Sequence, residues 1–64
     1  MRLIKATVDK EQHTAAIMYD RDTGVYVGEV LSLDVPAGFD TEREDQIRPM
    51  IRKTVRRVRD KALN

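Results

Sequence analysis

The chain has no cysteine, and this absence constrains its fold strongly because the chain is only 64 residues long. A domain of this size buries about 60% of the surface that its unfolded form exposes, so its net stability is small. Such domains usually gain stability from disulfides, a structural metal or a second subunit. Disulfides are excluded here, and a structural zinc site would lack thiolates and have only His13 as a histidine. The sequence therefore predicts one small domain over residues 1–64 that forms a homodimer and holds no metal.

Apolar residues at a spacing of two predict three strands, over residues 2–9, 14–20 and 25–33. The second strand is apolar on both sides, which indicates a central position in the sheet. Between the second and third strands, Asp20, Asp22 and Gly24 predict a hairpin, because aspartates accept hydrogen bonds within turns and glycine adopts a positive φ. Within the third strand, Gly28 indicates a bulge or a close approach by another element.

A helix is predicted over residues 41–62, after Pro36 and Gly38 end the sheet. Thr41 and Glu44 match a capping box at its start. Pro49 is expected to kink this helix; the alternative is a short turn followed by a helix that begins at Pro49. The expected fold is α+β, a three-stranded antiparallel meander followed by one long C-terminal helix. Its apolar stripe consists of Ile47, Met50, Ile51, Val55, Val58 and Ala62.

Charge is distributed very unevenly along the chain. Residues 1–45 hold five Lys or Arg against ten Asp or Glu, whereas residues 46–64 hold seven cations against Asp60 alone. On a helix these cations fall into two rows that border the apolar stripe. One row consists of Arg48, Arg52, Arg56 and Arg59, and the other of Lys53, Arg57 and Lys61.

The basic rows have several interpretations. They are typical of a solvated helix whose long side chains cover its own apolar edges. They also suit nucleic-acid phosphates or an acidic protein partner, including the acidic half of a second copy. A membrane surface is disfavoured because the stripe lacks tryptophan and phenylalanine. We predict a non-enzymatic regulatory or accessory protein that binds DNA or RNA. Its expected phosphate contacts are Arg48, Arg52, Lys53, Arg56, Arg57 and Arg59.

The alternative function is a protein-interaction module, such as an inhibitor, an antitoxin or a complex subunit. One helix covers only one face of a sheet, whereas the second and third strands are apolar on both faces. The predicted helix is also longer than the predicted strands, so its end should project beyond the sheet. The residues expected at a dimer or partner interface are Val27, Leu31, Val58 and Leu63.

Catalytic and ligand-binding patterns are weak in this sequence, and no catalytic residue or cofactor is predicted. Ser32, the threonines and His13 are the available catalytic groups, and His13 is expected to be solvated in or beside a turn. Asp20 and Asp22 resemble the opening of a calcium loop, but Gly24 stands one position too early. No apolar stretch is long enough for a signal peptide or a membrane span. These features indicate a soluble, cytoplasmic protein.

One family resemblance rests on a hairpin and a helix start, through Asp20, Gly24, Tyr26, Val30, Gly38, Thr41 and Glu42. With these residues the chain resembles the small HicB-like antitoxin domains, which also run from a glycine hairpin to a helix. The alanine-rich helix that is usual in that family is replaced here by an arginine-rich one. No residue role and no function is therefore carried over from the family.

Overall fold

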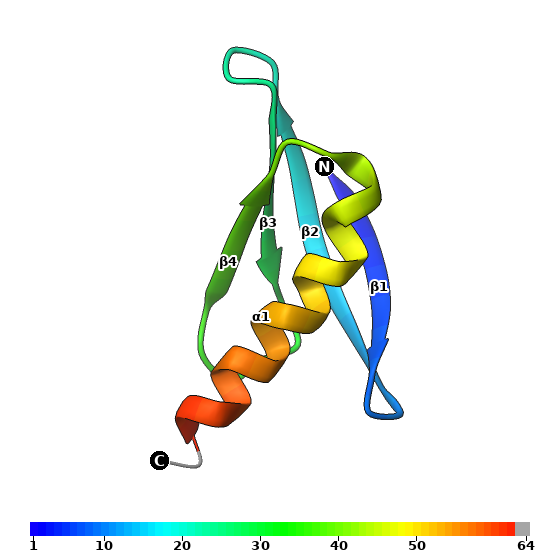
Figure 1. The fold of residues 1–64 in the computed structure, drawn as a ribbon, viewed down its shortest axis with the longest axis vertical. Helices are drawn as coiled ribbons and strands as arrows, with labels where there is room; N and C mark the ends of the chain where they lie inside the picture. The colour runs from blue at the N-terminus through cyan, green and yellow to red at the C-terminus, as the bar shows by residue number, and fades with distance from the viewer. Residues whose placement is uncertain (63–64) are drawn as a thin grey trace.

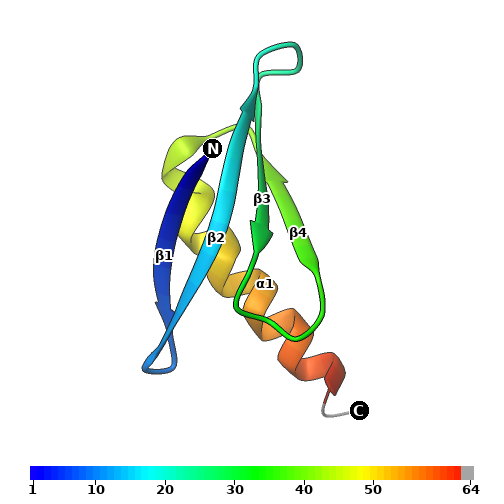
Figure 2. The ribbon, with the colours of Figure 1, turned by 180° about the vertical axis from the view of Figure 1, so that it is seen from behind.

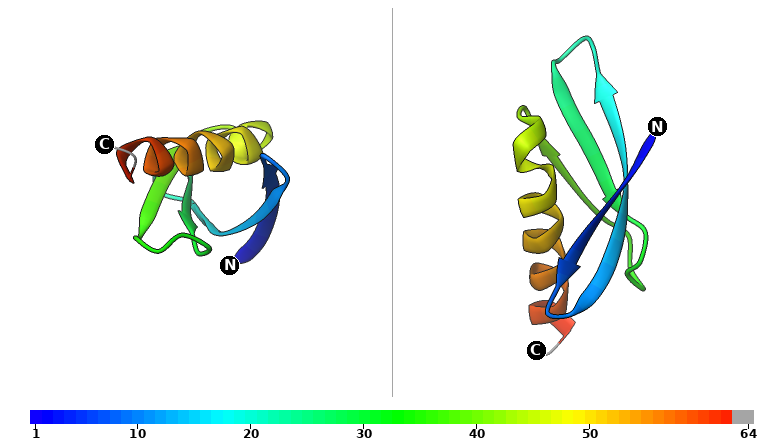
Figure 3. Two further views of the ribbon diagram at one scale, coloured as in Figure 1. Left: turned by 90° about the horizontal axis from the view of Figure 1, so that it is seen from below. Right: turned by 90° about the vertical axis from the view of Figure 1, so that its right-hand side faces the viewer.

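The computed structural model describes residues 1–62 as two layers, an antiparallel sheet and one helix that covers a single face of it (Figures 1 and 3). The sheet contains β1 (Arg2–Val8), β2 (Glu11–Asp20), β3 (Val25–Val30) and β4 (Ala37–Thr41), which lie side by side in chain order. A short 3₁₀ turn, η1 (Glu44–Gln46), leads into α1 (Ile47–Ala62). The predicted α+β class, with an antiparallel sheet followed by a C-terminal helix, is confirmed.

The sheet has four strands, so the prediction of three was wrong. β3 ends at Val30 rather than at residue 33, and the chain returns as β4 after a loop over residues 31–36. Pro36 and Gly38 were expected to end the sheet, but Pro36 lies just before β4, and Gly38 pairs with Glu29 on β3. β4 is an edge strand, where glycine and a preceding proline are tolerated.

The hairpin between β1 and β2 is tighter than predicted. Val8 pairs directly with Glu11, so only Asp9 and Lys10 form the loop. Both have positive φ, 49° and 71°, as a two-residue type I′ turn requires. The sequence Asp-Lys is unusual for this turn, because a lysine rarely adopts such a φ. β2 therefore begins at residue 11 and not at residue 14.

The hairpin between β2 and β3 confirms the turn that was predicted at Asp20, Asp22 and Gly24. The Gly24 N–H donates to the Asp20 carbonyl at 2.8 Å, and Gly24 has a φ of 72°. The Asp22 N–H donates to Oδ1 of Asp20 at 2.9 Å. In Figure 1 this hairpin projects past the start of α1, so the helix does not cover its tip.

The core lies between α1 and the sheet face that it covers. On β1, buried and exposed residues alternate, which places Ile4, Ala6 and Val8 on the helix side, as predicted. α1 packs against β1, β3 and β4. Apolar burial of this kind contributes roughly 25 cal/mol per Å². The main core cluster consists of Ile4, Ala6, Val8, Ala15, Ile17, Val30, Phe39, Ile47, Ile51 and Val55.

Gly28 on β3 is buried beneath the ring of Phe39. The two residues are direct partners across β3 and β4, and a Cβ at position 28 would overlap the Phe39 ring. This confirms the predicted close approach by another element. Phe39 therefore occupies the space that a side chain would otherwise fill on the neighbouring strand.

The start of the helix differs from the prediction. Thr41 ends β4, and its Oγ1 accepts from the Arg43 N–H at 3.3 Å instead of capping a helix that begins there. α1 begins at Ile47, which makes Pro49 its third residue. The first four N–H groups of a helix have no partner within it, so Pro49 removes no internal hydrogen bond. The helix does not begin at residue 41. The observed order, a short turn and then a helix, is that of the alternative, except that the helix begins at Ile47 and not at Pro49.

We predict that Gly28→Ala destabilises the fold by about 1 to 3 kcal/mol, because the new methyl group displaces the Phe39 ring from the core. Urea denaturation followed by circular dichroism measures the change. Glu42→Ala, at an exposed position just after β4, is the control and should change stability by less than about 0.5 kcal/mol. Equal effects of the two substitutions would contradict the packing of Phe39 on Gly28.

We also predict that Lys10→Gly stabilises the fold by about 0.5 to 1 kcal/mol, because Asp-Gly suits a type I′ turn and relieves the positive φ of a lysine. The matched control is Lys10→Ala, which removes the same charge but keeps the Cβ. It should not stabilise the protein. A urea midpoint that falls in the glycine variant would show that the turn adopts another geometry.

Candidate nucleic-acid interface

α1 carries seven cations and one carboxylate, and its apolar stripe determines where they lie. Ile47, Ile51, Thr54 and Val55 are buried against the sheet, so the cations occupy the rest of the helix circumference. Those beside the sheet can reach its edges, whereas those opposite the stripe face solvent. The structure therefore divides the predicted phosphate contacts into two groups.

Arg48 and Arg52 lie on the flank of α1 next to β1 and hydrogen-bond to its backbone. Nε of Arg48 donates to the Lys5 carbonyl, and Nε of Arg52 donates to the Thr7 carbonyl, both at 3.2 Å. β1 is an edge strand, so its outward carbonyls have no neighbouring strand to pair with. The two arginines occupy these acceptors and tie α1 to the edge of the sheet.

Arg59 continues this flank and binds the hairpin between β1 and β2. Its Nη1 lies 2.8 Å from Oδ2 of Asp9, and its Nη2 lies 3.2 Å from Oε1 of Glu11. The Arg59 side chain is only 31% exposed. A guanidinium that contacts two carboxylates joins the last turns of the helix to the first hairpin. Like Arg48 and Arg52, it is engaged within the fold.

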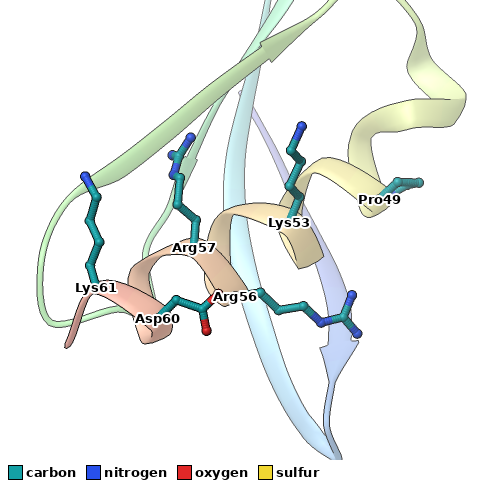
Figure 4. A pocket seen from close by; sticks show the side chains of 6 residues that line it. All are labelled: Pro49, Lys53, Arg56, Arg57, Asp60 and Lys61. Carbon is teal, nitrogen blue, oxygen red and sulfur yellow. The ribbon is translucent and has the colours of Figure 1, made fainter. Parts of the chain in front are cut away.

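Four other cations form what we call the outer basic face: Lys53, Arg56, Arg57 and Lys61. They surround a shallow, open hollow of about 470 Å³ that Pro49 and Asp60 also line. In Figure 4, Lys53, Arg57 and Lys61 extend to one side of α1 and Arg56 extends to the other. Arg57 also reaches the Gly38 carbonyl on β4, at a long 3.4 Å.

The outer basic face has no carboxylate partner within residues 1–62. All ion pairs found there involve Arg2, His13, Arg43 or Arg59. Asp60 lines the same hollow but lies beyond ion-pair distance of the four cations. Cations without carboxylate partners on a solvated surface attract polyanions and exchange their counterions for phosphates.

His13 is buried, so the prediction of a solvated histidine was wrong. Because β2 begins at residue 11, His13 lies inside the strand, on the helix side, opposite Ala6. Its Nδ1 lies 2.7 Å from Oγ of Ser32, which joins β2 to the loop after β3. Its Nε2 is buried, has no hydrogen-bond partner among the described residues and lies 3.9 Å from Oε2 of Glu11.

The residues predicted at a dimer or partner interface occupy different places. Val27 and Leu31 are exposed on the side of the sheet away from α1. Val58 belongs to α1 itself and is partly buried. Leu63 lies outside the described residues. Sequence analysis did not single out two exposed apolar residues, Leu3 and Met18. In β1 the sequence pattern predicted only the buried side, which does not include Leu3. The pairing of Leu3 with Ala16 on β2 is what places its side chain on the uncovered face of the sheet.

Two further features of residues 1–62 concern metals and membranes. No cluster of three or more histidine or acidic side chains there is arranged to hold a metal ion. Over the same range, no helix combines the length and apolar character that crossing a lipid bilayer requires.

We predict that Arg52→Gln lowers stability by about 0.5 to 1.5 kcal/mol, because it removes the hydrogen bond to the edge of β1. Lys53→Gln removes the same charge from the next residue, which makes no such contact, and should leave stability within about 0.5 kcal/mol. Urea denaturation of both variants measures the difference. If Lys53→Gln lowers stability as much as Arg52→Gln does, the charge of the helix, and not the hydrogen bond to β1, is responsible for the effect.

Comparisons with known proteins provide no family for this chain. No protein-family model matches it, and neither a curated protein nor a solved structure gives a significant match. The resemblance to HicB-like domains thus has no support from these comparisons. The function has to be inferred from the fold and from the chemistry of its surface.

Proposed function

We propose that the protein binds nucleic acid through the outer basic face of α1 and acts as a non-enzymatic regulatory or accessory factor. The observation that carries this proposal is the absence of carboxylate partners for Lys53, Arg56, Arg57 and Lys61 within residues 1–62. Cations that serve the fold, such as Arg59, have partners. The four outer cations have no such carboxylate, and only Arg57 donates within the fold, to the Gly38 carbonyl at a long 3.4 Å, so their charge is available for an external anion.

The spacing of these cations suits a phosphate backbone. From Lys53 to Lys61 the helix rises about 12 Å, at about 1.5 Å per residue. A duplex presents one phosphate charge per about 1.7 Å of its axis, so several phosphates lie within this span. Arginines on such a face can also contact base edges, whereas lysine contacts to phosphates carry no sequence information.

This proposal narrows the set of contacts expected from the sequence. Arg48, Arg52 and Arg59 already donate to β1 or to the first hairpin, so they support the face instead of forming it. Lys61, which was not among the expected contacts, joins the set because it lines the same hollow. Dimerisation remains a separate proposal and concerns the opposite side of the molecule.

The test is a fluorescence-anisotropy titration of labelled duplex DNA and single-stranded RNA, at 50 mM and at 200 mM salt. Three or four phosphate contacts predict a fall in affinity of roughly 50-fold to 150-fold between the two salt concentrations for a duplex. The double variant Lys53→Gln/Arg56→Gln should bind at least tenfold more weakly at 50 mM salt. Its slope of log K against log salt should be smaller by about two.

The matched control is Lys10→Gln/Arg21→Gln, which removes two cations from the hairpin turns at opposite ends of the sheet. It should retain nearly the full affinity and the full salt slope. Equal losses in both double variants would show that net charge, and not this face, governs binding. If the wild-type protein binds neither nucleic acid at 50 mM salt, the proposal is wrong, and the alternative function, a protein-interaction module, takes its place.

A further inference from the structure

The sheet face opposite α1, which we call the open face, carries several large and exposed apolar side chains. Figure 2 views the molecule from this side, where no helix covers the strands. Leu3 is 65% exposed, Met18 59%, Val27 49% and Leu31 54%. Met18 and Val27 are direct cross-strand partners, and Leu3 pairs with Ala16 on the same face. A contiguous apolar surface of this kind marks an interaction site.

The open face has a ridge between two hollows. Met18 and Val27 form walls of two adjacent hollows, of about 400 Å³ and about 140 Å³. The larger extends toward Tyr19 and Arg21 at the tip of the hairpin, and the smaller extends toward Met1 and Glu29. A ridge between two hollows is self-complementary, because the ridge of one copy can enter a hollow of another.

Charges on the open face are separated across the strands. Among the strand residues of this face, the cation is Lys5, on β1 at one edge, whereas Glu29 and Asp40 lie on β3 and β4 toward the other edge. Asp20, at the end of β2, accepts a hydrogen bond within its own hairpin through Oδ1, and Arg21 of the same hairpin lines the larger hollow. A half-turn about an axis along β2 brings the basic edge of one copy over the acidic edge of another. Lys5 then comes within reach of Glu29 of the partner subunit.

We propose that a second copy of this chain packs face to face on the open face, around a two-fold axis that runs along β2. The apolar centre, the ridge between two hollows and the separated charges all fit an isologous interface, in which each copy presents the same surface. Packed sheets lie about 10 Å apart, close enough for side chains of both faces to interdigitate. The two α1 helices then lie on opposite outer surfaces of the dimer.

The test is sedimentation velocity of the intact chain without nucleic acid, over a range of micromolar concentrations. The wild-type protein should sediment as a dimer. Met18→Glu should raise the dimer dissociation constant at least tenfold, because it places a carboxylate in the apolar centre. Val35→Glu is the matched control, because Val35 is a similarly exposed apolar residue, at 52%, in the loop before β4. It should leave the dimer unchanged.

The orientation of the two copies is tested by exchanging charges. Lys5→Glu and Glu29→Lys should each weaken the dimer roughly tenfold, and the double variant Lys5→Glu/Glu29→Lys should restore it. Circular dichroism checks that every variant remains folded. A wild-type protein that stays monomeric at every concentration overturns the proposal. A double variant whose dimer is no tighter than those of the single variants overturns it as well.

The dimer has a consequence that rests on the nucleic-acid function proposed above. Because the two outer basic faces point in opposite directions, one dimer should hold two duplexes at once. Donor-labelled and acceptor-labelled duplexes mixed with the wild-type protein should then show energy transfer, and Met18→Glu should abolish it more strongly than Val35→Glu. A dimer that binds no duplex would leave the interface intact and overturn the nucleic-acid function alone.

Discussion

The packing of one helical stripe on one face of the sheet is the contact on which the rest of this structure depends. The chain has a single core, and Ile47, Ile51 and Val55 provide the helix side of it. With no disulfide to compensate, losing this contact would remove most of the buried apolar surface. The orientation of α1 about its own axis is therefore fixed by burial, and this orientation determines where each of its cations lies.

Burial separates the cations into two groups with different environments. Arg48, Arg52 and Arg59 lie beside β1, where backbone carbonyls and carboxylates accept their hydrogen bonds. The edge strand gains protection from this arrangement, since its exposed carbonyls would otherwise be available to a strand of another chain. The outer basic face lies away from β1 and has no carboxylate partner within residues 1–62, and of its four cations only Arg57 reaches a backbone carbonyl, that of Gly38. Its charge therefore remains available for a partner. One basic helix can thus stabilise the fold and present a binding surface.

Much of the fold could be predicted from local patterns, and the errors have physical causes. The correctly predicted features depend on residues that are close in the sequence. They are the alternation in β1, the turn at Gly24 and the apolar stripe of α1. β4 was missed because a five-residue edge strand with a glycine has only two buried residues, Ala37 and Phe39, to show its period. His13 was misplaced because the turn at Asp9 and Lys10 uses a positive φ at Lys10, which a lysine rarely adopts. The division of the arginines depends on which carbonyls lie within reach, and that information exists only in three dimensions.

The central claim is that the arginines of α1 are divided between the fold and an external anion, and arginine side-chain NMR tests it most directly. Exchange of each Nε–H with water is measured first, and the same signals are then followed during addition of duplex DNA. The account predicts slow exchange for Arg48 and Arg52, fast exchange for Arg56, and DNA-induced shifts concentrated at Arg56 and Arg57. Fast exchange at Arg48 and Arg52, together with shifts there as large as those at Arg56, would contradict it.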